Sequence, residues 1–326
     1  MRIQTAAGPI DPDDLGPTLM HEHPDSAAPS GFYSGGKGAD VEEGAQRALA
    51  CLRESGIRSI VHLTGRRRDD VDHSILGRLA ARLPFHLIAG FSFYKDPWLE
   101  GLGGDLDSLV DLYVTQATKG IGGSEIKAGI YGEVGTSLDR ITPLEELHLR
   151  AVARAHVATG LAISTHCTLG TMGLEQVAIL GEEGVDLSRV VVGHLDLKPD
   201  VGYHQEVLST GANIAFDTFG KEWFDYRVPN SEGEGEGEFV KWTYHRPDED
   251  RIWALAELVT LGYDDRIVLS CDMSGAEAYM NPSTHGRFGY AYLPEVILPR
   301  LLEAGLAPKS LDRMLIDNPA RILAMS

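Results

Sequence analysis

The feature that most constrains the fold of this 326-residue chain is a repeated alternation of short apolar runs with longer amphipathic stretches. Each apolar run is rich in β-branched or other apolar residues and ends in polar residues, as a strand buried in a parallel sheet does. The runs are Thr18–His23, Ile57–Thr64, Phe85–Phe93, Ala128–Gly135, Leu161–Cys167, Arg189–Asp196, Asn213–Gly220 and Arg266–Asp272. The pattern predicts eight strands.

Between these runs, apolar residues recur with the 3.6-residue period of a helix. These stretches are Val41–Ser55, Asp70–Leu83, Leu106–Thr118, Pro143–Thr159, Gly173–Glu183, Val201–Ser209 and Asp248–Leu261. Several are followed by a glycine, which favours the left-handed conformation that closes a helix, as at Gly160 and Gly262. Two further helices are predicted after the last strand, at about Pro294–Ala304 and Ser310–Met325.

Strands that alternate with helices in this way indicate an α/β fold, a closed parallel (β/α)8 TIM barrel. The alternative is an open, doubly wound parallel sheet. No glycine fingerprint of a dinucleotide site follows the first strand, and an open sheet leaves the histidines at the end of that strand unexplained. We therefore predict one barrel domain that spans residues 1–326.

In a (β/α)8 barrel, the active groups lie at the C-terminal ends of the strands. His21 and His23 end the first strand, where alternation places both side chains on one face, about 7 Å apart. The ends of later strands add further residues of metal-binding type, namely Glu133, His166, His194 and Asp272. Six such residues on one rim predict a site for two divalent ions.

The composition argues against several classes of partner. A formal net charge of −19 disfavours binding to nucleic acid or to an anionic membrane surface, and part of this charge lies in the low-complexity acidic segment Ser231–Glu238. No apolar run approaches membrane-spanning length, and the N-terminus lacks the apolar core of a signal peptide, so we expect a cytoplasmic protein. We expect a small-molecule substrate and a homodimer.

Several short motifs carry a more specific pattern. They are Gly8-Pro9-Ile10, Gly16–His23, Ser164–His166, Gly173–Gln176, Val192–His194, Leu269–Asp272 and Asn318–Arg321. With them the chain resembles, nearly end to end, the phosphotriesterase family of the amidohydrolase superfamily. The resemblance implies that His21, His23 and Asp272 hold the more buried metal ion, and that His166 and His194 hold the more exposed one.

The residue that bridges the two ions departs from the commoner pattern of that family, in which a carboxylated lysine on the fourth strand has this role. The matching segment here, Ala128–Ser137, resembles the subgroup that bridges with a glutamate, the phosphotriesterase homology proteins. We therefore assign the bridge to Glu133, and place Lys127 at the start of the strand, at the far end of the barrel. Histidine and carboxylate ligands without a thiolate suit zinc, with manganese, cobalt or iron as alternatives.

The resemblance implies a metal-dependent hydrolase in which Asp272 is both a ligand and the catalytic proton acceptor. Our leading expectation is hydrolysis of a carboxylic ester, a lactone, with weak promiscuous phosphotriesterase activity. One alternative is an amidohydrolase that acts on an N-acyl amino-acid-like compound. Another is a non-catalytic barrel that binds a small metabolite.

Substrate selection is expected in the loops that follow strands 7 and 8. Lys221, Arg287 and Tyr290 are candidate contacts for an anionic group on the substrate, with surface ion pairs as the alternative. Tyr94, which follows the third strand, is a candidate to lie over the metals, although the spacing of 90–94 does not decide which aromatic does so. Aromatic residues of the segment 221–247 either line a pocket or only pack the loop.

Overall fold

A computed structural model describes residues 1–24, 39–63, 74–100, 104–222, 226–227, 242–243, 246–274, 277–278 and 281–325. Its central sheet has eight strands in the order β12-β9-β8-β7-β6-β5-β4-β3, and neighbouring strands are parallel. The strands are β3 (Thr18–Glu22), β4 (Ser59–His62), β5 (His86–Phe91), β6 (Ile130–Thr136), β7 (Ile163–Cys167), β8 (Val190–Gly193), β9 (Asn213–Phe216) and β12 (Ile267–Leu269). Each of the eight predicted strands is found, and the predicted (β/α)8 barrel is confirmed.

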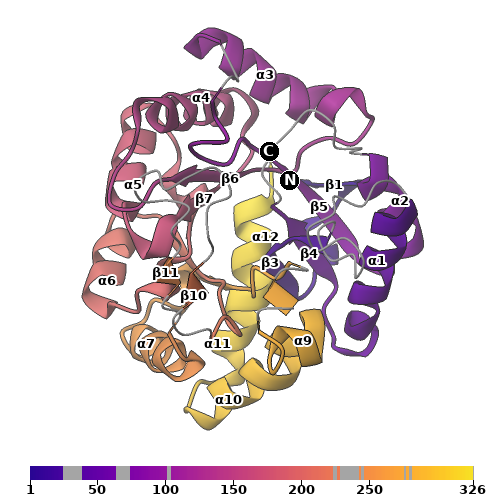
Figure 1. Ribbon diagram of the computed structural model, residues 1–326, viewed down its shortest axis with the longest axis vertical. Helices are drawn as coiled ribbons and strands as arrows, with labels where there is room; N and C mark the ends of the chain where they lie inside the picture. The colour runs from indigo at the N-terminus through magenta and orange to yellow at the C-terminus, as the bar shows by residue number, and fades with distance from the viewer. Residues whose placement is uncertain are drawn as a thin grey trace.

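Most of the helices surround the strands on the outside of the barrel, whereas the last helix, α12 (Asn318–Leu323), crosses the middle of the view (Figure 1). The other helices are α1 (Ala39–Leu49), α2 (Ser74–Arg82), α3 (Leu106–Thr118), α4 (Pro143–Thr159), α5 (Gly173–Glu182), α6 (Val201–Ser209), α7 (Asp248–Thr260), α9 (His285–Phe288), α10 (Leu298–Glu303) and α11 (Pro308–Asp312). The two predicted C-terminal helices are interrupted by wider π-type turns at 293–297 and 313–317. The four-residue α9 was not predicted, because so short a helix shows no 3.6-residue period.

Local sequence explains where the helices begin and end, as α4 illustrates. The Thr142 hydroxyl accepts a hydrogen bond from the backbone N–H of Glu145 at 3.2 Å, and the Glu145 carboxylate accepts one from the N–H of Thr142 at 2.9 Å. This capping box satisfies two backbone donors at the first turn. Gly160 then closes the helix with a left-handed φ of 73°.

Apolar side chains form two layers. One fills the inside of the barrel, and the other lies between the strands and the surrounding helices. The inner layer also includes Ile322 and Leu323 of α12 and Ile3 of the hairpin β1 (Ile3–Thr5) and β2 (Gly8–Ile10). Asn318 of α12 donates to the carbonyl oxygen of Ile267, the first residue of β12, at 2.7 Å. The N-terminal ends of the strands are therefore covered, and the site is left to their C-terminal ends.

Glu22 helps to close the barrel between its first and last strands. The N–H of Asp272 donates to the carbonyl oxygen of His21 at 3.1 Å across this seam. The buried Glu22 carboxylate accepts hydrogen bonds from the backbone N–H groups of Cys271 and Met273, at 3.0 and 2.8 Å, and from the Ser270 hydroxyl at 2.8 Å. One carboxylate thus joins β3 to the segment that carries Asp272.

We expect Glu22→Gln to lower the free energy of unfolding by about 1–3 kcal/mol, because the amide group turns a donor toward a buried backbone N–H that has lost its acceptor. Urea denaturation of the metal-free protein measures this loss. The matched control is Glu257→Gln, since Glu257 is exposed on α7 and should tolerate the change. Equal stabilities of the two variants would show that the Glu22 carboxylate does not hold the seam.

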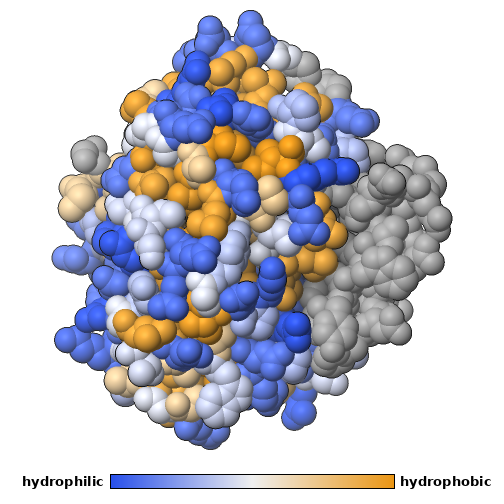
Figure 2. Space-filling view, turned by 90° about the vertical axis from the view of Figure 1, so that its left-hand side faces the viewer, coloured by the Kyte–Doolittle hydropathy of each residue, from blue (hydrophilic) through white to orange (hydrophobic). Residues whose placement is uncertain are grey.

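The outer face formed by α4, α5 and α6 carries apolar side chains that are interrupted by hydrophilic ones (Figure 2). Leu144 and Val157 of α4 are among the exposed large apolar residues. Within the described part of the chain, none of the helices has the length and apolar character needed to cross a membrane.

Candidate metal centre

Glu133 of β6 lies at the centre of the predicted ligand set. Its Oε2 atom is 2.8 Å from His166 Nδ1, 3.3 Å from His194 Nε2 and 3.8 Å from His21 Nε2. Its Oε1 atom is 3.8 Å from His23 Nε2. Five of the six residues that the sequence analysis placed on one rim therefore meet around a single carboxylate.

Asp272 completes the group from the end of β12. Its Oδ1 atom is 2.6 Å from His23 Nε2 and 3.5 Å from His21 Nε2. Two trios of donor atoms, each within 4.8 Å of one another, could hold a metal ion, namely His21, His23 and Asp272, and His21, Glu133 and His194.

The chemistry of these donors fits divalent cations. His21 Nε2 is buried and has no hydrogen-bond partner, which is unfavourable for a polar atom unless a cation occupies the space it faces. Imidazole nitrogens and carboxylate oxygens, with no thiolate, are the ligands of zinc and similar ions.

Asp217, the residue after β9, orients two of the histidines. Its Oδ2 atom is 2.9 Å from His21 Nδ1, and its Oδ1 atom is 3.0 Å from His194 Nδ1. Such a carboxylate fixes the imidazole rings, so that the Nε2 atoms of both histidines are directed to Glu133. The sequence analysis did not include Asp217 among the candidate site residues. The strand-end rule that found the others would have found it.

Two of the candidate ligands have unusual backbone conformations. His194 and Asp272 adopt φ angles of 61° and 46°, in the left-handed region that residues other than glycine rarely occupy. Such a conformation costs on the order of 1–3 kcal/mol and persists where surrounding contacts hold it. Here the contacts are the bond from the His194 N–H to Asp217 at 3.0 Å and the seam bonds around Asp272.

The surroundings favour the ionised form of the two carboxyl groups. Burial lowers the pKa of His21 and His194, but the neighbouring carboxylates of Asp272 and Asp217 outweigh it and raise both pKa values above the ordinary one. Burial alone would raise the pKa of Glu133, but the neighbouring His166 holds that pKa well below its usual range. Burial would likewise raise the pKa of Asp272, and Lys221 and His21 hold it well below. Burial also lowers the pKa of His166 well below its ordinary value. Both carboxyl groups are thus ionised at neutral pH.

Of the predicted substrate contacts, Tyr94 lies beside the centre. Its hydroxyl oxygen is 3.0 Å from His166 Nε2, and its ring packs edge-on against His166 with centroids 4.6 Å apart. Tyr290 instead lies in the outer apolar layer, and its hydroxyl donates to the Met273 carbonyl at 3.4 Å. Arg287 is exposed, with its guanidinium over the Phe288 ring.

Much of the segment 221–247, with Trp223, Phe224, Tyr244 and the acidic run 231–238, lies outside the described residues, so the expectations for it stay predictions. Tyr226 and Trp242 fall in the short pair β10 (Tyr226–Arg227) and β11 (Trp242–Thr243).

Two buried lysines border the centre. Lys221 donates to Asp272 Oδ2 and lies 3.3 Å from Glu277 Oε1. The sequence analysis instead expected it to contact an anionic group of the substrate. Lys95, which the sequence analysis did not single out, donates to the Thr168 hydroxyl at 2.6 Å, on the side of His166. Lys127 is exposed, as the assignment of the bridge to Glu133 requires.

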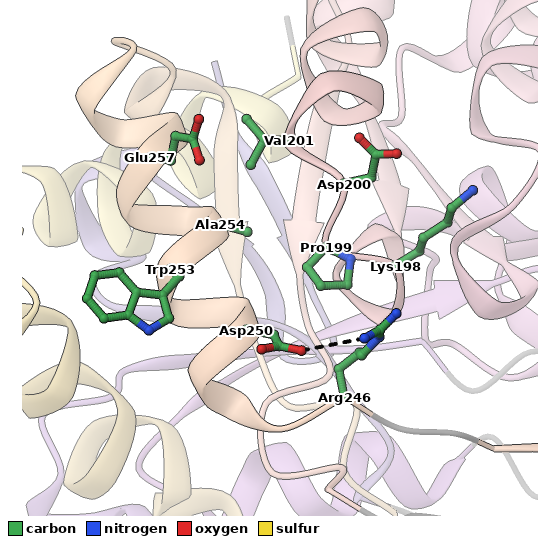
Figure 3. A pocket seen from close by; sticks show the side chains of 9 residues that line it. All are labelled: Lys198, Pro199, Asp200, Val201, Arg246, Asp250, Trp253, Ala254 and Glu257. Atoms are coloured by element: carbon green, nitrogen blue, oxygen red, sulfur yellow. Dashed lines mark ion pairs between the residues drawn. The ribbon is translucent and has the colours of Figure 1, made fainter.

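A separate groove of about 450 Å³ lies between the start of α6 and one side of α7 (Figure 3). Asp200 and Val201 line it at the start of α6, and Trp253 and Glu257 line it from α7. None of the predicted ligands lines it.

Comparison with known proteins identifies relatives of this chain. The model of the phosphotriesterase family matches residues 1–323. The phosphotriesterase homology protein of Escherichia coli is 34% identical over 316 residues, which cover 95% of this chain and 98% of that protein. An N-acetyltaurine hydrolase of Tetraodon nigroviridis is 29% identical and covers 98% of this chain and 96% of its own. The structure of a lactonase from Listeria monocytogenes superposes with a TM-score of 0.80 at 27% identity over all of both chains.

Proposed function

The chain belongs to the phosphotriesterase family, and on that basis we propose that it is a hydrolase that uses two divalent metal ions to cleave a carboxylic ester, with a lactone as the leading substrate class. The observation that carries the proposal is the position of Glu133, whose oxygens lie within 3.8 Å of four histidine nitrogens. The lactonase from Listeria monocytogenes supports the choice of a lactone.

In this proposal His21, His23 and Asp272 would hold one ion, His166 and His194 would hold the other, and the Glu133 carboxylate would contribute to both. Bound ions of this kind polarise a substrate carbonyl and lower the pKa of water, so that a nucleophile forms at neutral pH. The chain's own residues must then place the substrate and move protons.

We assign these tasks to residues that border the candidate ligands. The Asp272 carboxylate accepts the proton of the attacking water and returns it to the leaving oxygen. Asp217 keeps the rings of His21 and His194 fixed while this occurs. To the Tyr94 hydroxyl, which lies 3.0 Å from His166 Nε2, we assign a hydrogen bond to a substrate oxygen.

A second candidate is hydrolysis of an N-acyl amino-acid-like compound. It is favoured by the N-acetyltaurine hydrolase, which matches this chain over nearly its full length. The same residues can hydrolyse an amide. The amine is a poorer leaving group than an alkoxide, so its departure depends more on the proton that Asp272 transfers to it.

The deciding experiment loads metal-free protein with zinc or manganese, measures the bound metal by elemental analysis, and assays a panel of substrates. The panel contains γ- and δ-lactones, N-acetyl amino acids, N-acetyltaurine and a 4-nitrophenyl phosphotriester. We expect two ions per chain and the highest kcat/KM on a lactone. A preference for the N-acetyl compounds would select the second candidate. Less than one ion per chain after loading would contradict both and revive the non-catalytic barrel.

A further inference from the structure

Lys221 is held between two carboxylates rather than facing open space. Its side chain is buried, and its ammonium donates to Asp272 Oδ2 and lies 3.3 Å from Glu277 Oε1. The other oxygen of Asp272, Oδ1, is the one that faces His21 and His23. The two oxygens of this candidate ligand therefore have different partners.

The backbone around Lys221 is fixed from several directions. The Gly220 N–H donates to Asp248 Oδ1 at 3.0 Å, and the Gly220 carbonyl accepts from the Thr284 hydroxyl at 2.6 Å. The Lys221 carbonyl accepts from the guanidinium of the fully buried Arg251 at 3.2 Å. Gly220 itself has a φ of +88°, and a Cβ there would lie 2.4 Å from His285 Nε2. These contacts fix the backbone from which the Lys221 side chain reaches Asp272.

Glu277 is fixed in turn. Its Oε2 atom accepts a hydrogen bond from Asn281 Nδ2 at 2.9 Å, and Asn281 Oδ1 accepts one from the backbone N–H of Glu222 at 3.1 Å. The chain of contacts thus returns to the residue next to Lys221. Glu277 supplies a second negative charge, so the Lys221 ammonium is paired with two carboxylates. Asp272 therefore keeps negative charge with which to bind a cation.

We propose that Lys221 is a positioning residue for Asp272, and that Glu277 holds its ammonium in place. By engaging Oδ2, the ammonium fixes the rotation of the carboxylate with Oδ1 toward His21 and His23. This inference rests on the proposed function, and it replaces the sequence-based expectation that Lys221 recognises an anionic group on the substrate. The two roles predict different kinetic effects of a substitution. Loss of a positioning residue lowers the turnover of every substrate alike, whereas loss of a substrate contact weakens the binding of the anionic substrate alone.

The experiment compares Lys221→Met, Glu277→Gln, the double variant and the control Lys198→Met, which removes an exposed lysine near the start of α6. Each full-length protein is loaded with cobalt, and its visible absorption spectrum reports the geometry of the ligands. Each is then assayed on 4-nitrophenyl acetate, which is neutral, and on mono-4-nitrophenyl succinate, which carries a carboxylate.

We expect Lys221→Met to change the cobalt spectrum and to lower kcat by about 10–100-fold on both esters, with little change in KM. Glu277→Gln should act in the same direction but less strongly, and the double variant should be no worse than Lys221→Met, because both changes act on one contact. Lys198→Met should behave as the unsubstituted protein.

Two results would overturn the inference. One is an unchanged spectrum with unchanged kcat, and the other is a rise in KM confined to the anionic ester, which would place Lys221 against the substrate. The spectra separate this inference from the proposed function. Failure of the unsubstituted protein to bind cobalt contradicts the proposed function, whereas a cobalt spectrum and a kcat that are both unaffected by Lys221→Met contradict only the role of Lys221.

Discussion

Replacing Asp272 with asparagine is expected to lower kcat by about 10²–10⁴-fold while most of the bound metal is retained. Asparagine keeps a side-chain oxygen where Oδ1 lies, 2.6 Å from His23 Nε2, but its amide cannot accept the proton of the attacking water. It also removes the charge that pairs with Lys221. Steady-state kinetics together with elemental analysis of the same preparation measure the two effects.

Asp264 provides a matched control for this variant. Its side chain is 13% exposed, as is that of Asp272, and it forms an ion pair with Arg313 at 2.8 Å, away from the candidate ligands. Asp264→Asn therefore tests the loss of a mostly buried, paired carboxylate without touching the centre, and it should leave kcat nearly unchanged. Turnover of Asp272→Asn close to that of the control would remove Asp272 from the path of the proton.

The second large effect is expected for Glu133→Gln, which should lower kcat/KM by about 10³-fold and release at least one of the two ions, since the metals contribute several kcal/mol to the transition state. The neutral amide no longer supplies the negative charge that four histidines surround. Elemental analysis and kinetics of the loaded variant measure the result. Retention of two ions with high activity would show that Glu133 does not bridge them.

A bridge made by glutamate needs no carbon dioxide, whereas a carboxylated lysine does. Metal-free protein should therefore regain full activity on addition of metal alone, with no gain from bicarbonate. The exposed Lys127 serves as the control, since Lys127→Met should reconstitute as the unsubstituted protein does. Strong dependence on bicarbonate that is lost in Lys127→Met would transfer the bridge from Glu133 to that lysine.

The fold could be predicted from the sequence because it depends on repeating local patterns. Apolar runs of strand length recur between stretches of helical period, and the predicted bounds of α3, α4 and α6 match those observed. The wider turns before α10 and between α11 and α12 were missed, because apolar residues keep a near-helical period through them, and Pro294 in the first of them is equally compatible with the first turn of an α-helix.

The candidate ligands could be predicted for a related reason. Once strands are parallel and closed into a barrel, their C-terminal ends meet on one rim, so residue type and position at a strand end suffice to bring Glu133 among the histidines. No distance needs to be known for that step.

Only the tertiary structure decided which atoms of these residues face one another. The Asp217 carboxylate contacts both His21 and His194, and the Lys221 ammonium donates to Asp272. The Glu22 carboxylate accepts a hydrogen bond from the backbone N–H of Met273 across the seam of the barrel. The first and last of these contacts join residues 196 and 251 positions apart. Such contacts depend on side-chain rotation and on the packing of neighbouring loops, and the order of residues along a strand does not encode either.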